Sequence, residues 1–217
     1  MNSKQKKIFD SMPIIAILRN IEPSQVIDIA TELVLAGIRI IEIPLNCPDA
    51  LKSIKILQEN FSHHIVCGAG TVVTTKDVEN IKQINAEIAV APNTCPKIIS
   101  HILEKNIIPI PGFTTPTEAF HAINSGAKHL KLFPAEFYGP KYLRSIRVVL
   151  PSDVSVFAVG GIHPGNIKSW MKAGATGFAI GSALFEPGFT TQDTREMSQE
   201  VVTAFRKARH ETRRLFR

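Results

Sequence analysis

The chain has 217 residues, of which 44% are hydrophobic, and it carries a formal net charge of +6. This length suits one large domain or two small ones, and this apolar fraction is typical of a globular protein with a core. No apolar run reaches the ~18 residues of a membrane-spanning helix, and the polar N-terminus lacks the apolar block of a signal peptide. We therefore expect a soluble, cytoplasmic protein with no membrane partner.

Short β-branched runs alternate along the chain with amphipathic segments. An extra N-terminal helix is expected before Pro13, where it could cap the bottom of the fold. The eight predicted strands then follow at 13–19, 39–45, 64–70, 87–92, 107–112, 128–134, 154–161 and 177–182. Helical patterns lie between them, as at 23–37, 48–60 and 164–174, and the glycines 37, 126 and 174 stand where helices are expected to stop.

Repeated strand–helix units predict a parallel sheet, and eight of them favour a closed barrel over an open sheet. The alternative is a doubly wound sheet. The segment GAGTVV (68–73) has Gly-x-Gly after a strand, but it lacks the third glycine of a dinucleotide-binding fingerprint. No linker or composition shift divides the chain. We therefore predict an α/β fold with one (β/α)8 TIM-barrel domain over 1–217.

The positive charge is concentrated at the C-terminus. Residues 206–217 hold six Lys/Arg and one Glu, so this basic tail accounts for +5 of the net charge. Such a tail can bind nucleic acid or an acidic surface. No interleaved aromatic residues support RNA binding, and a solvated helix end favoured by the helix dipole is the simpler interpretation. We expect no nucleic-acid partner, and the role of the tail stays open.

Residues that bind metals are few and scattered. Cys47, Cys67 and Cys95 lie far apart and match no zinc spacing, so we interpret them as reduced thiols. His63 and His64 lie at the beginning of the third strand, at the opposite end from the expected site. No cluster of Asp, Glu and His suits a metal ion. We expect neither a metal nor a cofactor.

Three ionisable residues interrupt apolar strands near the C-terminal ends, where (β/α)8 barrels carry their chemistry. Arg19 ends the first strand, Glu42 lies near the end of the second, and Lys131 lies within the apolar run HLKLFP of the sixth. A structural ion pair could explain any two of them, but three at one mouth favour a site. A desolvated amine has a lowered pKa and attacks carbonyls. Lys131 is therefore predicted to form a Schiff base, as in a class I aldolase.

The last two strands each end in a glycine-containing pair. Gly160 and Gly161 follow the seventh strand, and Gly181 and Ser182 follow the eighth. Glycine lets backbone N–H groups approach a ligand closely. A short helix is expected over 182–188, with its N-terminus at the same place, and a phosphate site of this kind recurs in barrels. Tight turns alone are the alternative.

Eight motifs occur in order from about Pro13 to Phe185: IAILR (15–19), IEIPLN (41–46), GAGTV (68–72), APN (91–93), PGFTTPTEA (111–119), LKLFPAE (130–136), FAVGGI (157–162) and GSALF (181–185). Together they resemble the 2-keto-3-deoxy-6-phosphogluconate and -galactonate aldolases. The resemblance implies a homotrimer of barrels without a metal. It also implies Lys131 as the Schiff-base lysine and Glu42 as the general acid/base.

The resemblance further implies roles in substrate binding. Thr71, Pro92 and Phe133 match the positions that hold the pyruvate half, and Arg19 matches an arginine of the galactonate branch that serves the substrate carboxylate. The phosphate-site positions are Gly160, Gly161, Gly181 and Ser182.

The implied reaction is cleavage of 2-dehydro-3-deoxy-6-phospho-D-galactonate to pyruvate and D-glyceraldehyde 3-phosphate. Asn46 stands where gluconate enzymes often carry arginine, and Val159 where they commonly carry threonine. Both differences, with Arg19, favour the galactonate branch.

Several alternatives remain open. The substrate could be 2-dehydro-3-deoxy-6-phosphogluconate or 4-hydroxy-2-oxoglutarate. In a phosphosugar isomerase or synthase, Lys131 would only bind charge. A non-catalytic barrel could sense a phosphorylated sugar acid, with the basic tail as its output.

Overall fold

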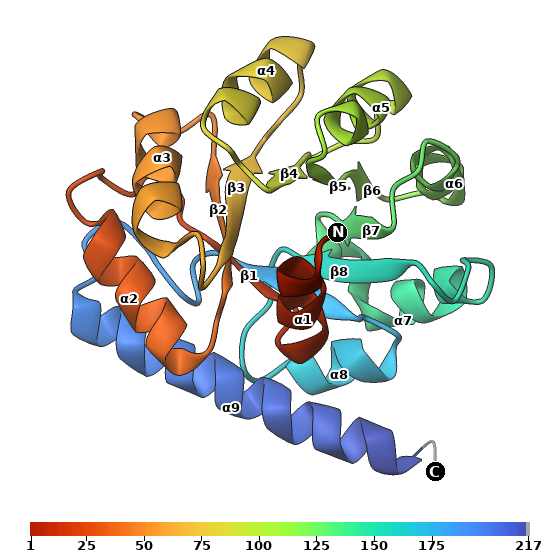
Figure 1. Cartoon of the computed structure of the whole chain (residues 1–217). Coiled ribbons are helices and arrows are strands. Elements are labelled where there is room, and N and C mark those ends of the chain that lie inside the picture. The colour runs from red at the N-terminus through yellow and green to blue at the C-terminus, as the bar shows by residue number, and fades with distance from the viewer. Residues whose placement is uncertain (216–217) are drawn as a thin grey trace.

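The computed structural model describes residues 1–215 and forms a parallel barrel surrounded by helices (Figure 1). The strands are β1 (Ile14–Ile17), β2 (Ile40–Pro44), β3 (Val66–Gly70), β4 (Ile88–Val90), β5 (Ile108–Ile110), β6 (Gly112–Phe113), β7 (His129–Leu132), β8 (Ser155–Val159) and β9 (Gly177–Ile180). The helices are α1 (Ser3–Ser11), α2 (Val26–Ala36), α3 (Ala50–Phe61), α4 (Thr75–Gln83), α5 (Pro96–Glu104), α6 (Pro116–Asn124), α7 (Ala135–Arg147), α8 (Ile167–Lys172) and α9 (Thr191–Leu215).

The first and last strands of the chain are neighbours in the barrel. The order is β5-β4-β3-β2-β1-β9-β8-β7-β6, so β1 lies between β2 and β9 and is parallel to both. The single break in the ring lies between β5 and β6. The predicted barrel is confirmed, and each of the eight predicted strands has a counterpart.

The fifth predicted strand differs from the observed one. The sequence pattern gave one strand over 107–112, whereas the structure has β5 and the short β6 on either side of Pro111. Proline has no backbone N–H to donate to a ladder, and its carbonyl instead accepts a 2.8 Å hydrogen bond from the Lys131 N–H. The turn at Pro111 therefore ties the start of β6 to β7 and leaves β5 paired only with β4.

Alternation along the strands sorts their side chains into two apolar layers. The outer layer packs between the strands and the surrounding helices. The inner layer fills the barrel and includes Ile15, Ile40, Val66, Phe157 and Val159, among others. Each buried position in this inner layer comes from a strand or from α1, so the barrel is a packed core rather than a channel.

The predicted N-terminal helix closes the bottom of the barrel. Ile8 and Phe9 of α1 join the inner apolar layer, and α1 lies across the barrel in Figure 1. The Lys4 ammonium donates hydrogen bonds to the carbonyls of Ser62 (2.7 Å) and Ile65 (3.0 Å) and pairs with Glu87. These contacts lie at the N-terminal ends of the strands, opposite the expected site.

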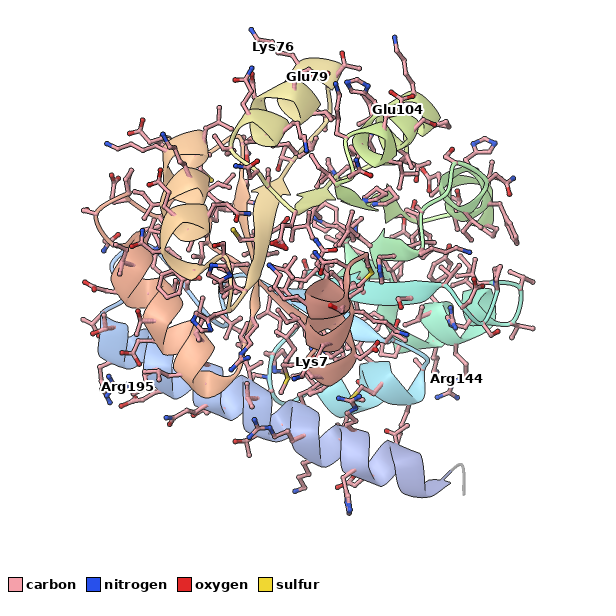
Figure 2. The ribbon with its side chains drawn as sticks, in the orientation of Figure 1. Lys7, Lys76, Glu79, Glu104, Arg144 and Arg195 are labelled. Atoms are coloured by element: carbon pink, nitrogen blue, oxygen red, sulfur yellow. The ribbon has the colours of Figure 1, made fainter. Side chains whose placement is uncertain are left out.

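Helix α9 is the longest element and packs along α2 and α8 (Figure 1). At its start, Arg195 binds the buried carboxylate of Glu32 on α2 through two hydrogen bonds of 2.7 and 2.8 Å. Arg195 lies at the periphery of the molecule, as do Glu79 of α4 and Glu104 of α5 (Figure 2). The Arg195–Glu32 pair therefore links α9 to α2, two helices that are distant in sequence.

The basic tail continues α9 as far as the structure describes it. Ala208 is only 2% exposed, and Arg209 donates hydrogen bonds to the carbonyls of Ser11 (2.6 Å) and Asp10 (2.8 Å) at the end of α1. The expected solvated helix end is thus partly packed; residues 216 and 217 lie outside the described part of the chain. Across residues 1–215, no helix combines the length and the apolar character that a membrane span requires.

Candidate active site

Lys131 points into the barrel from near the C-terminal end of β7. Its neighbours Leu130 and Leu132 belong to the outer apolar layer, so the strand alternation directs Lys131 inward. The residue is 8% exposed. Burial lowers the pKa of its amine, the nearby Arg19 charge lowers it further, and the Glu42 carboxylate opposes both effects. The net change favours the neutral, nucleophilic form of the amine.

Glu42 enters the same interior from β2. Ile41 and Ile43 face the outer layer, and Glu42 is 2% exposed. Burial raises the pKa of its carboxyl group, while the charges of Lys131 and Arg19 act in the opposite direction. A carboxyl group in this setting can hold a proton above its usual pH range, as proton transfer to a reacting group requires.

The Glu42 carboxylate has free hydrogen-bonding capacity and a glycine beside it. Its Oε2 is buried without a hydrogen-bond partner in the described part of the chain. A Cβ atom on Gly70 would lie 2.7 Å from Oε2 and 3.0 Å from the carboxyl carbon, so the carboxylate packs directly over this glycine. The sequence showed a glycine at the end of β3 but gave no sign of this contact, because it joins two strands.

Arg19 lies two residues beyond β1 and is exposed at the mouth. It follows the C-terminal end of β1, which is parallel to β2 with Ile17 opposite Glu42, and its charge lowers the pKa of both buried groups. The next residue, Asn20, has a positive φ of 57°, and its N–H donates to the Cys47 sulfur at 3.2 Å. Cys47 is therefore a buried thiol that holds the Arg19 loop, a role the sequence did not reveal.

The structure distributes the three predicted pyruvate-site residues around the mouth. Phe133 follows β7 directly, is 37% exposed, and has its ring centroid 4.7 Å from the Lys131 Nζ. Thr71 follows β3 with a positive φ of 58°, and Pro92 lies just beyond the neighbouring strand β4. Phe133 thus contacts Lys131 directly, whereas Thr71 and Pro92 are placed at the mouth by the strand ends that precede them.

The two glycine-containing turns are neighbours because β8 and β9 pair, with Val159 opposite Ala179. Gly160 and Gly161 both have positive φ, 104° and 66°. A Cβ on Gly161 would lie 2.7 Å from the Glu136 side chain, so this position also lacks room for a larger residue. The backbone of this turn therefore depends on glycine at both positions.

The short helix expected over 182–188 does not form. The N–H groups of Leu184 and Phe185 both bond to the Gly181 carbonyl, at 2.8 and 3.0 Å, and close a single turn. Pro187 then has no N–H with which to extend it, and Gly188 adopts a positive φ of 98°. The helix prediction was wrong, and Gly181 and Ser182 lie at a tight turn beside Gly160.

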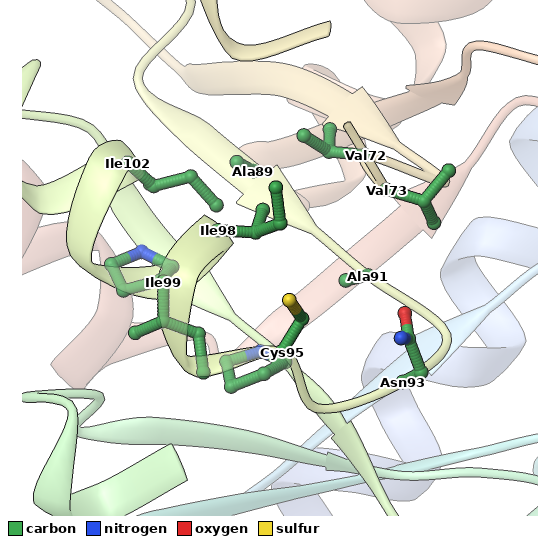
Figure 3. A pocket seen from close by; sticks show the side chains of 11 residues that line it. Val72, Val73, Ala89, Ala91, Asn93, Cys95, Ile98, Ile99 and Ile102 are labelled. Carbon is green, nitrogen blue, oxygen red and sulfur yellow. The ribbon is translucent and has the colours of Figure 1, made fainter. Parts of the chain in front are cut away.

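A separate apolar pocket lies under α5 (Figure 3). It is bounded by α5 and by the strands from β3 to β5, and its lining includes Val72, Ala89, Ile98 and Ile102, which belong to the outer layer. The lining has no charged residue. This pocket is a gap in the packing under α5 and offers none of the groups that the predicted chemistry needs.

Comparison with known proteins agrees with this geometry. The family model "KDPG and KHG aldolase" matches residues 5–200. The chain is 36% identical over 197 residues to the 2-dehydro-3-deoxy-6-phosphogalactonate aldolase of Escherichia coli (strain K12), covering 91% of this chain and 96% of that protein. It is 37% identical over 193 residues to a probable enzyme of the same name from Rhizobium meliloti (strain 1021), covering 89% and 91%.

Solved structures give the same result. The structure described as "Native KDPGal structure" superposes with a TM-score of 0.91 at 36% identity, covering 92% of this chain and 97% of that one. A cube-shaped protein cage, designed by fusing symmetric oligomeric domains, gives a TM-score of 0.92 at 35% identity, covering 94% of this chain and 76% of that one. The barrel, the inward-facing lysine and the sequence matches agree: the chain belongs to the KDPG and KHG aldolase family.

Proposed function

We propose that the protein is a class I aldolase that cleaves 2-dehydro-3-deoxy-6-phospho-D-galactonate to pyruvate and D-glyceraldehyde 3-phosphate. The observation that carries the proposal is Lys131, a buried amine of lowered pKa inside the barrel, with the Glu42 carboxyl group sharing that interior. The names of the relatives from Escherichia coli and Rhizobium meliloti support the choice of substrate.

The reaction begins when the neutral Lys131 amine adds to the C2 ketone. Glu42 gives a proton to the departing hydroxyl, water leaves, and an iminium forms. The ionised Glu42 then takes the proton of the C4 hydroxyl while the C3–C4 bond breaks, and the bond electrons move into the iminium to give an enamine. Glyceraldehyde 3-phosphate is released. Protonation of the enamine at C3 and addition of water then return the free lysine and pyruvate.

The other mouth residues are proposed to bind the substrate. Thr71, Pro92 and Phe133 hold the pyruvate half, which agrees with the contact of the Phe133 ring with Lys131. Arg19 pairs with the substrate carboxylate. The backbone N–H groups at Gly160, Gly161, Gly181 and Ser182 receive the phosphate, with the Ser182 hydroxyl as a further donor.

Borohydride trapping tests the mechanism. Pyruvate with sodium borohydride should add the mass of a reduced pyruvate adduct to Lys131, located by peptide mass spectrometry, because reduction fixes the iminium. Lys131→Met should abolish the adduct, and Lys141→Met, on the exposed face of α7, should keep it. A missing adduct in the wild type, or one on another lysine, refutes the mechanism. A missing adduct would favour a phosphosugar isomerase or a non-catalytic sensor, whereas an adduct on another lysine would assign the Schiff base to that residue.

The configuration preferred at C4 depends on the wall formed by β8. Val159 is buried there and offers only methyl groups, whereas a threonine could hydrogen-bond a C4 hydroxyl. We expect kcat/KM for the galactonate isomer to equal or exceed that for the gluconate isomer. Val159→Thr should shift the ratio toward gluconate by roughly 1 kcal/mol, the value of one hydrogen bond. A tenfold preference of the wild type for gluconate would overturn this substrate and leave the aldolase chemistry standing.

The assembly is proposed to be a homotrimer. The structural relative built from symmetric oligomeric domains supports an oligomer. Light scattering after size-exclusion chromatography should give the mass of three chains; a monomer would contradict the proposal.

A further inference from the structure

The Gly160–Gly161 turn needs contacts with other residues to fix its backbone. Both glycines have positive φ values, 104° and 66°, and neither has a side chain of its own to restrict the backbone. Glycine loses more conformational freedom on folding than any other residue. A turn that must aim its N–H groups at an anion therefore gains from contacts that fix its backbone.

The side chain of Asn166 makes such contacts. Its Nδ2 donates a 2.7 Å hydrogen bond to the Gly161 carbonyl, and its Oδ1 accepts a 3.1 Å bond from the His163 N–H. Asn166 stands at the N-cap of α8, yet its side chain makes no capping bond to that helix. Both functional atoms of the amide are used on the turn that leaves β8.

Asn166 is itself firmly held. Its N–H bonds to the His163 carbonyl at 3.0 Å, and its carbonyl accepts from the Ser169 hydroxyl at 2.7 Å and from the Ser169 N–H at 3.1 Å. The helix that follows is anchored in the core by Ile167 and Trp170, both buried. The amide is therefore a fixed link between a packed helix and a glycine turn.

We propose that Asn166 is a positioning residue for the phosphate group, acting through the Gly160–Gly161 backbone. The inference rests on the proposed function, because it assumes that this turn receives the phosphate of the substrate. Loss of the amide frees the turn and weakens binding of the phosphorylated substrate. It leaves the chemistry at Lys131 intact, since Asn166 contacts neither Lys131 nor Glu42 among the described hydrogen bonds.

Two reactions separate these effects. Cleavage of the phosphorylated substrate uses the whole site, whereas exchange of the pyruvate methyl protons with deuterated water uses the lysine and no phosphate. Asn166→Ala should raise KM for cleavage about tenfold or more, which corresponds to ~1.4 kcal/mol, while the exchange rate stays within about twofold. Inorganic phosphate should also inhibit the variant more weakly than the wild type.

A second substitution at Asn166 and a control substitution elsewhere test whether the hydrogen bond to the Gly161 carbonyl is the contact that matters. Asn166→Asp keeps the acceptor for His163 but cannot donate to the Gly161 carbonyl, so it should raise KM at least as much as alanine. Asn60→Ala is the matched control, because Asn60 donates to the Ile56 carbonyl within α3, remote from the turn. The control should leave both reactions unchanged.

The outcomes are distinct. A KM within twofold of wild type in both Asn166 variants overturns the inference while the aldolase stands. A parallel loss of cleavage, exchange and thermal stability also overturns it, because Asn166 would then only maintain the fold. A wild-type protein that exchanges no pyruvate protons and forms no borohydride adduct overturns the proposed function, and the inference with it.

Discussion

At the scale of single residues, Lys131 and Glu42 each work against folding. Because the pKa of Glu42 is raised in the folded protein, its contribution to stability is lost as pH rises above the ordinary pKa of a glutamate. Because the pKa of Lys131 is lowered, its contribution is lost as pH falls below the ordinary pKa of a lysine. Near neutral pH both groups therefore cost free energy. Such costs are expected at sites kept for chemistry rather than for packing.

Glu42→Gln should reduce kcat by roughly 10²-fold or more, the usual scale of general acid–base catalysis. The amide is nearly isosteric and uncharged, so the melting temperature should stay the same or rise. Steady-state kinetics with a thermal melt measures both quantities, and Glu104→Gln on the exposed surface of α5 is the control. Turnover within a factor of about two of wild type would assign the proton transfers to another group.

At the scale of elements, the sequence predicted most strands because each is a short apolar run bounded by turn residues. Lys131 stood out in the sequence because a lysine within such a run is costly to bury, and the structure shows that it is buried. The division at Pro111 was not recognisable, since IIPIPG reads as one continuous run. The helix expected after Gly181 was wrong for a different reason, since Pro187 is visible in the sequence as a residue without an N–H and could have been taken as the end of the turn.

Contacts between distant segments were equally inaccessible to sequence reasoning. The position of Gly70 looks ordinary in the chain, and its importance comes from the Glu42 carboxylate that the neighbouring strand brings to it. The basic tail is a further case, because its composition suggested a solvated end. Only the fold shows that Ala208 is buried and that Arg209 reaches the end of α1.

Truncation after Lys207 tests the tail as an element. The contacts of Ala208 and Arg209 with the body of the protein should make the truncated chain less stable, with a melting temperature lower by a few degrees. Cleavage at a temperature well below the melt should be unchanged, because the end of α1 lies at the opposite mouth from Lys131. An activity loss without a stability loss would give the tail a functional role.

At the scale of the whole molecule, His129 makes stability depend on pH. The centroid of its ring lies 4.8 Å from the ring centroid of Phe9 and 6.0 Å from that of Phe157. Burial and the nearby N-terminal ammonium lower its pKa from 6.5 to about 4, and Asp10 opposes them. The unfolded chain therefore binds more protons between these two values, and stability should fall as pH drops from 6.5 toward 4.

The expected loss from this one group is on the order of 3 kcal/mol over that window. Chemical denaturation at a series of pH values measures it. His129→Leu should flatten the profile, whereas His64→Gln, an exposed histidine before β3, should leave it unchanged. A wild-type slope that persists in His129→Leu would contradict the assignment.

The closed bottom of the barrel fixes the order in which the proposed products depart. Because α1 and the inner apolar layer fill the barrel at the N-terminal ends of the strands, substrate and products can pass only through the mouth at the C-terminal ends. In the proposed mechanism, pyruvate stays covalently attached to Lys131 inside the barrel after the carbon–carbon bond breaks, whereas the phosphorylated aldehyde is bound only by the turns beyond β8 and β9. The aldehyde must leave first, and the reverse condensation must load pyruvate first. Product inhibition should therefore follow an ordered pattern, with pyruvate competing directly with the substrate for the free enzyme.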